Sequence, residues 1–112
     1  MNLRLYMAQR ITALLMAPLV LGHLAVMIYA IRGGLSAAEI LGRTQGSVAW
    51  FAFYGLFVVA VSIHGAIGLR AIAQEWGGVR GRGLDVLMWG AGLLLLWLGA
   101  RSVWAVTFGA GA

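Results

Sequence analysis

The stretch Ile11–Ile31, ITALLMAPLVLGHLAVMIYAI, decides the fold, because it runs for 21 residues without a charged side chain. As a helix rising ~1.5 Å per residue it reaches about 30 Å, which is the thickness of the hydrocarbon layer of a bilayer. Two further apolar runs follow, at about residues 45–70 and 84–106. The sequence therefore predicts an all-α integral membrane protein with three transmembrane helices in a single domain over residues 1–112.

The amino-acid composition supports this prediction. Hydrophobic residues make up 62% of the chain and only three residues are acidic, which is unlike a soluble domain. Lipid or partner subunits must therefore cover the helices. The absence of cysteine excludes disulfides, thiolate-held iron–sulfur clusters and covalent c-type haem on this chain. The eight arginines lie between the apolar runs and do not cluster with aromatic residues, which argues against nucleic-acid binding.

The arginines also predict the orientation of the chain, because cytoplasmic segments of membrane proteins are enriched in positive charge. Five fall on the N-terminal side of the predicted spans and three on the other side: Arg4, Arg10, Arg70, Arg80 and Arg82 against Arg32, Arg43 and Arg101. We therefore expect the N-terminus and the second connecting segment to face the cytoplasm, with the chain in the inner (cytoplasmic) membrane.

Glycines and charged residues mark the two connecting segments, 31–43 and 70–85, as loops. In the first, Ser36 and Glu39 have the spacing of a capping box, which predicts a helical turn over residues 36–41. The first span is not expected to be a cleaved signal peptide. Its apolar stretch exceeds the ~7–15 residues of a signal core, and no small-x-small site follows it.

His23 and His64 are the ionisable side chains that lie well inside the predicted spans. A polar group in hydrocarbon is costly unless it is paired, so intramembrane histidines are usually functional. Histidine is also the usual axial ligand of b-type haem in helix bundles, and Ala60 and Gly68, one turn on either side of His64, predict room for a flat macrocycle. The alternative is a histidine that is hydrogen-bonded to a neighbouring helix.

Depth separates these two candidate metal ligands. His23 lies slightly past the middle of an outward-running span and His64 farther past the middle of a returning one, so they differ in depth by ~12 Å at ~1.5 Å per residue. Two axial ligands of one upright haem should lie at similar depth. If both histidines bind haem, each therefore serves a different haem and needs a second ligand from another chain.

The residues that follow His64 resemble a family signature. His64, Gly68 and Arg70 in HGAIGLR, followed by Glu75 and Trp76, are similar to the second helix of the small membrane anchors of succinate dehydrogenase and fumarate reductase. That signature is His-x-x-x-Gly-x-(Arg or Gln), then an acid and usually an aromatic residue eleven and twelve positions after the histidine, as here.

The first span is similar to the same family. Residues 8–13, AQRITA, with Pro18 and Leu19 beyond, resemble the opening of the D-type anchor, whereas the spacing from Arg10 to His64 suits the C-type anchor. The resemblance covers roughly residues 6–76 and leaves the choice between C-type and D-type open.

The resemblance implies a fold and a function. In this family two such anchors form a multi-subunit helical bundle that sandwiches haem b and holds a flavoprotein subunit and an iron–sulfur subunit on the membrane. Electrons pass from succinate through flavin and clusters to a quinone near the anchor, or in reverse during fumarate reduction. The chain would then be a membrane-anchor domain that transfers electrons and has no catalytic succinate site.

The resemblance also implies roles for individual residues. His64 matches the haem ligand of the family, Arg10 matches the C-type arginine near the quinone, and Glu75 and Trp76 match the acid and tyrosine of the D-type quinone site.

Arg70 and Arg10 are expected near the cytoplasmic interface, where they could pair with haem propionates or simply extend into the interface.

The chain departs from the family pattern at three points. Trp76 replaces the usual tyrosine, and its indole can donate a hydrogen bond but can neither ionise nor accept one. Tyr6 or Gln9 stands where the C-type chain has serine or histidine. His23 is absent from the single-haem pattern, but a first-helix histidine is a feature of the two-haem members, so one or two haems are possible.

Two other classes of protein remain as alternatives. A haem b anchor of another respiratory dehydrogenase, such as a formate or hydrogen enzyme, usually has more spans and several histidines per chain. A small transporter or a haem-free structural anchor is the other class. A drug-efflux transporter of this length normally needs a carboxylate in its first span, and residues 11–31 contain none. The visible spectrum of the reduced complex distinguishes these classes.

Overall fold

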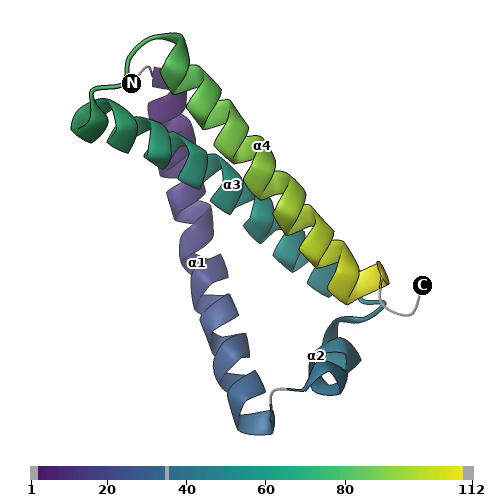
Figure 1. The fold of residues 1–112 in the computed structure, drawn as a ribbon. Coiled ribbons are helices and arrows are strands. Elements are labelled where there is room, and N and C mark those ends of the chain that lie inside the picture. Colours follow the sequence, from purple (N-terminus) through teal and green to yellow (C-terminus); the bar gives the residue numbers. More distant parts are fainter. Residues whose placement is uncertain (1–2, 35, 110–112) are drawn as a thin grey trace.

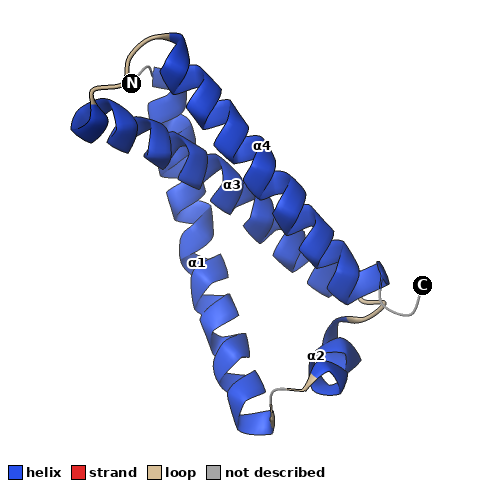
Figure 2. Cartoon of the chain, viewed as in Figure 1, coloured by secondary structure: helices blue, strands red, loops and turns tan. Residues whose placement is uncertain are grey.

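The computed structural model describes residues 3–34 and 36–109, and all regular structure in this part of the chain is helical (Figure 2). The order is α1 (Leu3–Gly33), α2 (Ala37–Thr44), α3 (Val48–Gly77) and α4 (Arg82–Trp104), which continues into a π-helical stretch, η1 (Ala105–Gly109) (Figure 1). Helices α1, α3, and α4 with η1 are long and apolar enough to cross a membrane. The predicted all-α fold with three spans is confirmed.

The long helices continue beyond the apolar runs that predicted them. The segment 70–85, predicted to be a loop, is instead helical as far as Gly77 and again from Arg82. Residues 71–74, AIAQ, are mostly good helix formers. The helix ends where Gly78 adopts a left-handed backbone with φ of 68°, a conformation that favours glycine. Charged residues limit the part of a helix that crosses the membrane, but they do not end the helix.

The short helix α2 begins where the capping pattern predicted. The Ser36 hydroxyl accepts a hydrogen bond from the Glu39 backbone N–H at 3.1 Å. The helix then runs to Thr44, three residues beyond the predicted turn over 36–41. The Thr44 hydroxyl lies 2.7 Å from the Val106 carbonyl oxygen and donates to it, which ties α2 to η1.

Helices α3 and α4 form an antiparallel pair that meets along small residues (Figure 1). A Cβ atom added at Gly92 would lie 3.2 Å from the Cβ of Ala66. The approach is closer at Gly99, where an added Cβ would lie 2.5 Å from Cγ1 of Val58. Small residues let two backbones come close, which favours helix association in lipid because van der Waals packing drives it there.

Gly99→Ala should destabilise the α3–α4 pair by about 1–3 kcal/mol, because the added methyl group requires Val58 or a whole helix to move. The matched control is Gly90→Ala on the same helix, where an added Cβ meets nothing within 4 Å. The measurement is the midpoint temperature of thermal unfolding of the detergent-solubilised complex. Equal midpoints for the two variants would show that the Gly99 contact does not limit packing.

Few apolar side chains are buried within the described part of this chain, and they are Leu19, Ala60, Ala66, Ile67, Leu84 and Val103. Most large apolar side chains along the spans point outward, and Leu14, for example, is 76% exposed. An apolar surface of this extent requires lipid or partner subunits to cover it.

Helix α1 lies across α3 and not parallel to it (Figure 1). The start of α1, the end of α3 and the start of α4 lie at one end of the molecule, whereas α2 lies at the other. We call these the arginine-rich end and the α2 end, because the first carries Arg4, Arg10, Arg70, Arg80 and Arg82. Beyond its contacts with α3, the last part of α1 stands apart from α3 and α4 and leads into α2.

Candidate functional site

His64 lies where α3 crosses α1. Its imidazole is half-buried, and its Nδ1 atom lies 3.3 Å from the hydroxyl oxygen of Thr12, which is 5% exposed. The Thr12 hydroxyl also lies 2.7 Å from the carbonyl oxygen of Ala8 and 3.0 Å from that of Gln9. Thr12 of α1 and His64 of α3 thus form a polar contact between two otherwise apolar helices.

The space expected beside His64 is partly taken by α1. Ala60 is buried, with 2% of its surface exposed. Gly68 lies against Gln9, whose side-chain nitrogen would be 3.5 Å from a Cβ added at Gly68. Helix α1 therefore lies against this face of α3 at Gly68. Gln9 also has a buried side-chain oxygen without a hydrogen-bond partner in the described residues.

The contact with Thr12 is made by the Nδ1 atom of His64. The second ring nitrogen, Nε2, makes no hydrogen bond within residues 3–34 and 36–109. One ring nitrogen of His64 therefore has a hydrogen-bond partner within the described chain, and the other remains available to a group from another molecule.

His23 lies in a different environment. Its ring makes edge-on contacts with Phe57 and Tyr54 of α3, with centroids 5.3 Å and 6.2 Å away, and it makes no hydrogen bond within the described part of the chain. It also borders an open groove of about 390 Å³ lined by residues of α1, α3 and α4. The predicted alternative, a hydrogen bond to a neighbouring helix, is not formed among the described residues of this chain.

The two histidines lie at different levels of the bundle. On α1, His23 follows Thr12, the partner of His64, by eleven residues, or about 16 Å of helix rise. On α3, His64 follows Phe57, the neighbour of His23, by seven residues, or about 10 Å. These two values lie on either side of the separation of ~12 Å estimated from the sequence.

Arg70 points toward the start of α4. One of its terminal nitrogens lies 3.6 Å from a carboxylate oxygen of Asp85, and the two side chains are 18% and 60% exposed. The distance is that of an ion pair and not of a hydrogen bond. The buried Nε atom of Arg70 has no hydrogen-bond partner among the described residues. The charge of Arg70 is therefore partly balanced by Asp85.

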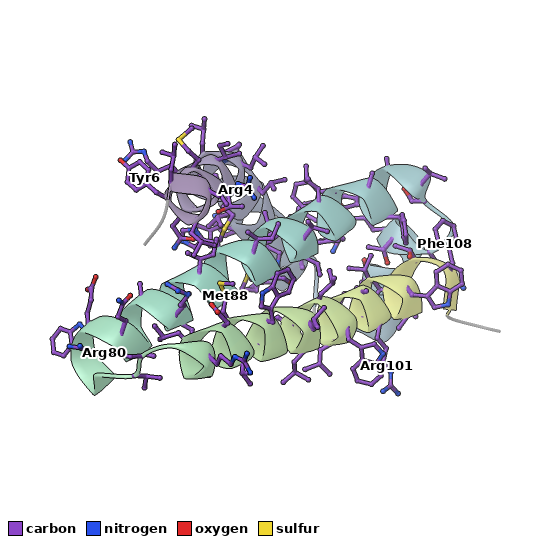
Figure 3. The ribbon with its side chains drawn as sticks, turned by 90° about the horizontal axis from the view of Figure 1, so that it is seen from above. Arg4, Tyr6, Arg80, Met88, Arg101 and Phe108 are labelled. Atoms are coloured by element: carbon purple, nitrogen blue, oxygen red, sulfur yellow. The ribbon has the colours of Figure 1, made fainter. Side chains whose placement is uncertain are left out.

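Arg10 lies in the first third of α1, and Glu75 and Trp76 lie in the last turn of α3, so all three lie toward the arginine-rich end. No hydrogen bond, ion pair or ring contact joins Arg10 to the other two among the described residues. The Arg10 guanidinium lies over the ring of Tyr6 on its own helix, 5.7 Å from the centroid, and Tyr6 points away from α3 and α4 (Figure 3). Trp76 is 86% exposed. This chain alone does not bring the three predicted quinone residues into one pocket.

An apolar groove of about 330 Å³ lies where the first turns of α1 meet α3 and α4. Its lining includes Leu5 and Ala8 from α1 and Met88 and Trp89 from α4, and none of the predicted site residues takes part. A groove of this composition accommodates hydrocarbon.

Sequence reasoning missed two polar residues with notable contacts. Thr12 was not singled out, although a hydroxyl in an uncharged span is a natural partner for an intramembrane histidine. Arg43 lies over the rings of Tyr29 and Trp50, 5.5 Å and 5.9 Å from their centroids, and joins α2 to α1 and α3. An arginine near interfacial aromatic residues was the available signal.

The fold and the intramembrane histidines define the class of this protein: a small multi-pass membrane subunit whose exposed faces require partners. The sequence matches, over residues 2–100, the family described as succinate dehydrogenase/fumarate reductase transmembrane subunit. The chain belongs to this family, and it is a membrane-anchor subunit of a multi-subunit complex of that kind. Comparison with curated proteins and with solved structures gave no match.

Proposed function

We propose that this chain binds haem b through His64 and passes electrons between the iron–sulfur subunit and a quinone. The observation that carries the proposal is the half-buried His64 imidazole, which keeps one nitrogen without a hydrogen bond in the described chain. When bound, haem b supplies a one-electron carrier within the membrane. The iron would take its second axial ligand from the other anchor subunit.

The donor set fits haem better than a protein-held metal ion. Haem needs only axial side chains because the porphyrin supplies the remaining ligands, whereas zinc takes three or four protein ligands. No group of three or more potential metal ligands forms among the described residues. Arg70, whose guanidinium makes only a long ion pair of 3.6 Å with Asp85 among the described residues, is a candidate partner for a propionate.

The experiment that tests this function is a reduced-minus-oxidised visible spectrum of the purified complex, with haem and subunit stoichiometry. We expect a b-type spectrum in a complex that contains a flavoprotein subunit, an iron–sulfur subunit and a second anchor. A complex without haem would favour the haem-free structural anchor. Co-purification with the catalytic subunit of another respiratory dehydrogenase would favour the other alternative.

We further propose that His23 ligates a second, distal haem. Three observations support it: the imidazole has no hydrogen bond in the described chain, it borders the open groove of about 390 Å³, and it lies at a different level from His64. A polar ring in hydrocarbon needs a partner, and an iron would satisfy one of its nitrogens. The second axial ligand would again come from another chain.

The proposed quinone site lies at the arginine-rich end and includes Arg10, Glu75 and Trp76. Their match to the family signature and their common end of the bundle support it. Because Arg10 does not contact the other two residues here, we propose that the second anchor and the iron–sulfur subunit complete the pocket. This end would face the cytoplasm in the inner membrane, in agreement with the excess of arginines on it.

Arg10→Ala should weaken the binding of a quinone-site inhibitor about tenfold or more, because a hydrogen bond from a charged group is worth roughly 1.5–3 kcal/mol. Trp76→Ala should weaken it by about two- to tenfold, because a neutral hydrogen bond is worth roughly 0.5–1.5 kcal/mol. Arg4→Ala, on the same helix and equally exposed to the arginine-rich end, is the matched control. Inhibitor titration of quinone reduction gives the affinities. Unchanged affinity in both test variants would remove these residues from the site.

A further inference from the structure

The Thr12 hydroxyl has three polar neighbours but only one proton with which to donate a hydrogen bond. Three atoms lie around its oxygen: the Ala8 carbonyl oxygen at 2.7 Å, the Gln9 carbonyl oxygen at 3.0 Å and His64 Nδ1 at 3.3 Å. A hydroxyl has a single proton to donate and two lone pairs that accept. Carbonyl oxygens can only accept, so the proton goes toward the backbone of α1, as is usual for threonine within a helix.

The remaining contact must then run in the other direction. Because the Thr12 proton is used toward the Ala8 carbonyl, the Thr12 oxygen accepts and the Nδ1–H of His64 donates. A neutral imidazole carries one proton, so Nε2 is left with its lone pair. In the opposite arrangement Thr12 would donate to Nδ1 and would lose its shorter hydrogen bond to the Ala8 carbonyl. The imidazole proton would then lie on Nε2, where it would block metal binding.

We infer that Thr12 is a positioning residue: it accepts a hydrogen bond from Nδ1 of His64, fixes the tautomer that presents Nε2 to an iron, and sets the orientation of the imidazole from α1. The inference rests on the proposed role of His64 as a haem ligand. Thr12 is 5% exposed at the crossing of the two helices and lies on α1, whereas His64 lies on α3.

The hydrogen bond should tune the iron as well as orient the ring. An acceptor at Nδ1 increases the electron donation of Nε2, which favours the ferric over the ferrous state. Loss of the acceptor should therefore raise the midpoint potential of the haem held by His64. It should also weaken haem retention, since loss of such an outer partner typically costs about 10–100-fold in affinity.

The test compares Thr12→Val with Thr12→Ser in the intact complex. Valine has the shape of threonine but has no hydroxyl, and serine keeps the hydroxyl. We expect the valine variant to show a raised potential, shifted electron paramagnetic resonance g-values of the low-spin ferric haem, and at least tenfold weaker haem retention. The serine variant should restore all three. Because the hydroxyl donates to its own helix, its removal should leave the helix intact.

The outcomes separate this inference from the proposed function. If the wild-type complex holds haem and Thr12→Val leaves potential and g-values unchanged, His64 can still be the ligand but Thr12 does not position it. If serine and valine shift the values equally, the effect is packing, and the inference is wrong. A wild-type complex without haem would overturn both proposals. Should the valine variant not assemble, Thr12→Ala removes the hydroxyl with a smaller side chain and gives the same comparison.

Discussion

His64→Ala should remove the haem b that we propose this residue binds at the crossing of α1 and α3, with loss of one haem per pair of anchor subunits. The variant deletes the only imidazole near Thr12, and alanine offers the iron no ligand atom. Electron transfer from succinate to quinone should fall strongly, while oxidation of succinate by a soluble dye at the flavoprotein should persist, because that site lies on another subunit. Visible spectra and haem extraction of the purified complex measure the loss.

The control for this variant is Leu56→Ala, which shortens an exposed side chain on the same helix two turns earlier. It should retain the wild-type spectrum. A His64→Ala complex with full haem content and an unchanged α-band would show that another residue holds the iron.

His23→Ala should reduce the haem content from two to one per pair of anchors and leave the haem held by His64 in place. The two imidazoles lie about 10–16 Å apart along the bundle by helix rise, so removing one should not disturb the other. A redox titration should lose one of two midpoint potentials. The complex should otherwise assemble, because His23 makes only ring contacts with Tyr54 and Phe57 in the described chain.

Leu24→Ala is the matched control, since Leu24 follows His23 on α1 and is 50% exposed. It should keep both haems. One haem in the wild-type complex would end the two-haem proposal without affecting His64. Two haems in the His23→Ala complex would assign the second haem to a ligand from elsewhere.

The three spans could be predicted because the signal is local: a run of about 20 uncharged apolar residues has few other uses. The α2 start was likewise predictable from Ser36 and Glu39, which lie one turn apart. The end of α3 was not, because the charge at Arg70 ends the apolar run, whereas the backbone geometry at Gly78 ends the helix.

The candidate site was predictable in its residue types but not in its contacts. An imidazole in hydrocarbon is visible in the sequence. The partner of His64, however, lies 52 residues away on another helix, and its identity depends on how α1 crosses α3. Likewise, the sequence placed Arg10 at the same end as Glu75 and Trp76, but it could not show that Arg10 lies over Tyr6 instead of near them.

The lengths of the helices bear on how a soluble partner could exchange electrons with this subunit. Helices α1 and α3 have 31 and 30 residues, or about 45 Å each, against a hydrocarbon layer of about 30 Å. If Arg10 and Arg70 mark the boundary, about 10 Å of each helix emerges on the same side. A soluble subunit bound to these ends would contact α3, the helix that carries His64. Trp76 lies about 18 Å from His64 along that helix. The helix would then act as a rigid spacer, so that the electron-transfer distance would not vary with the motion of a loop.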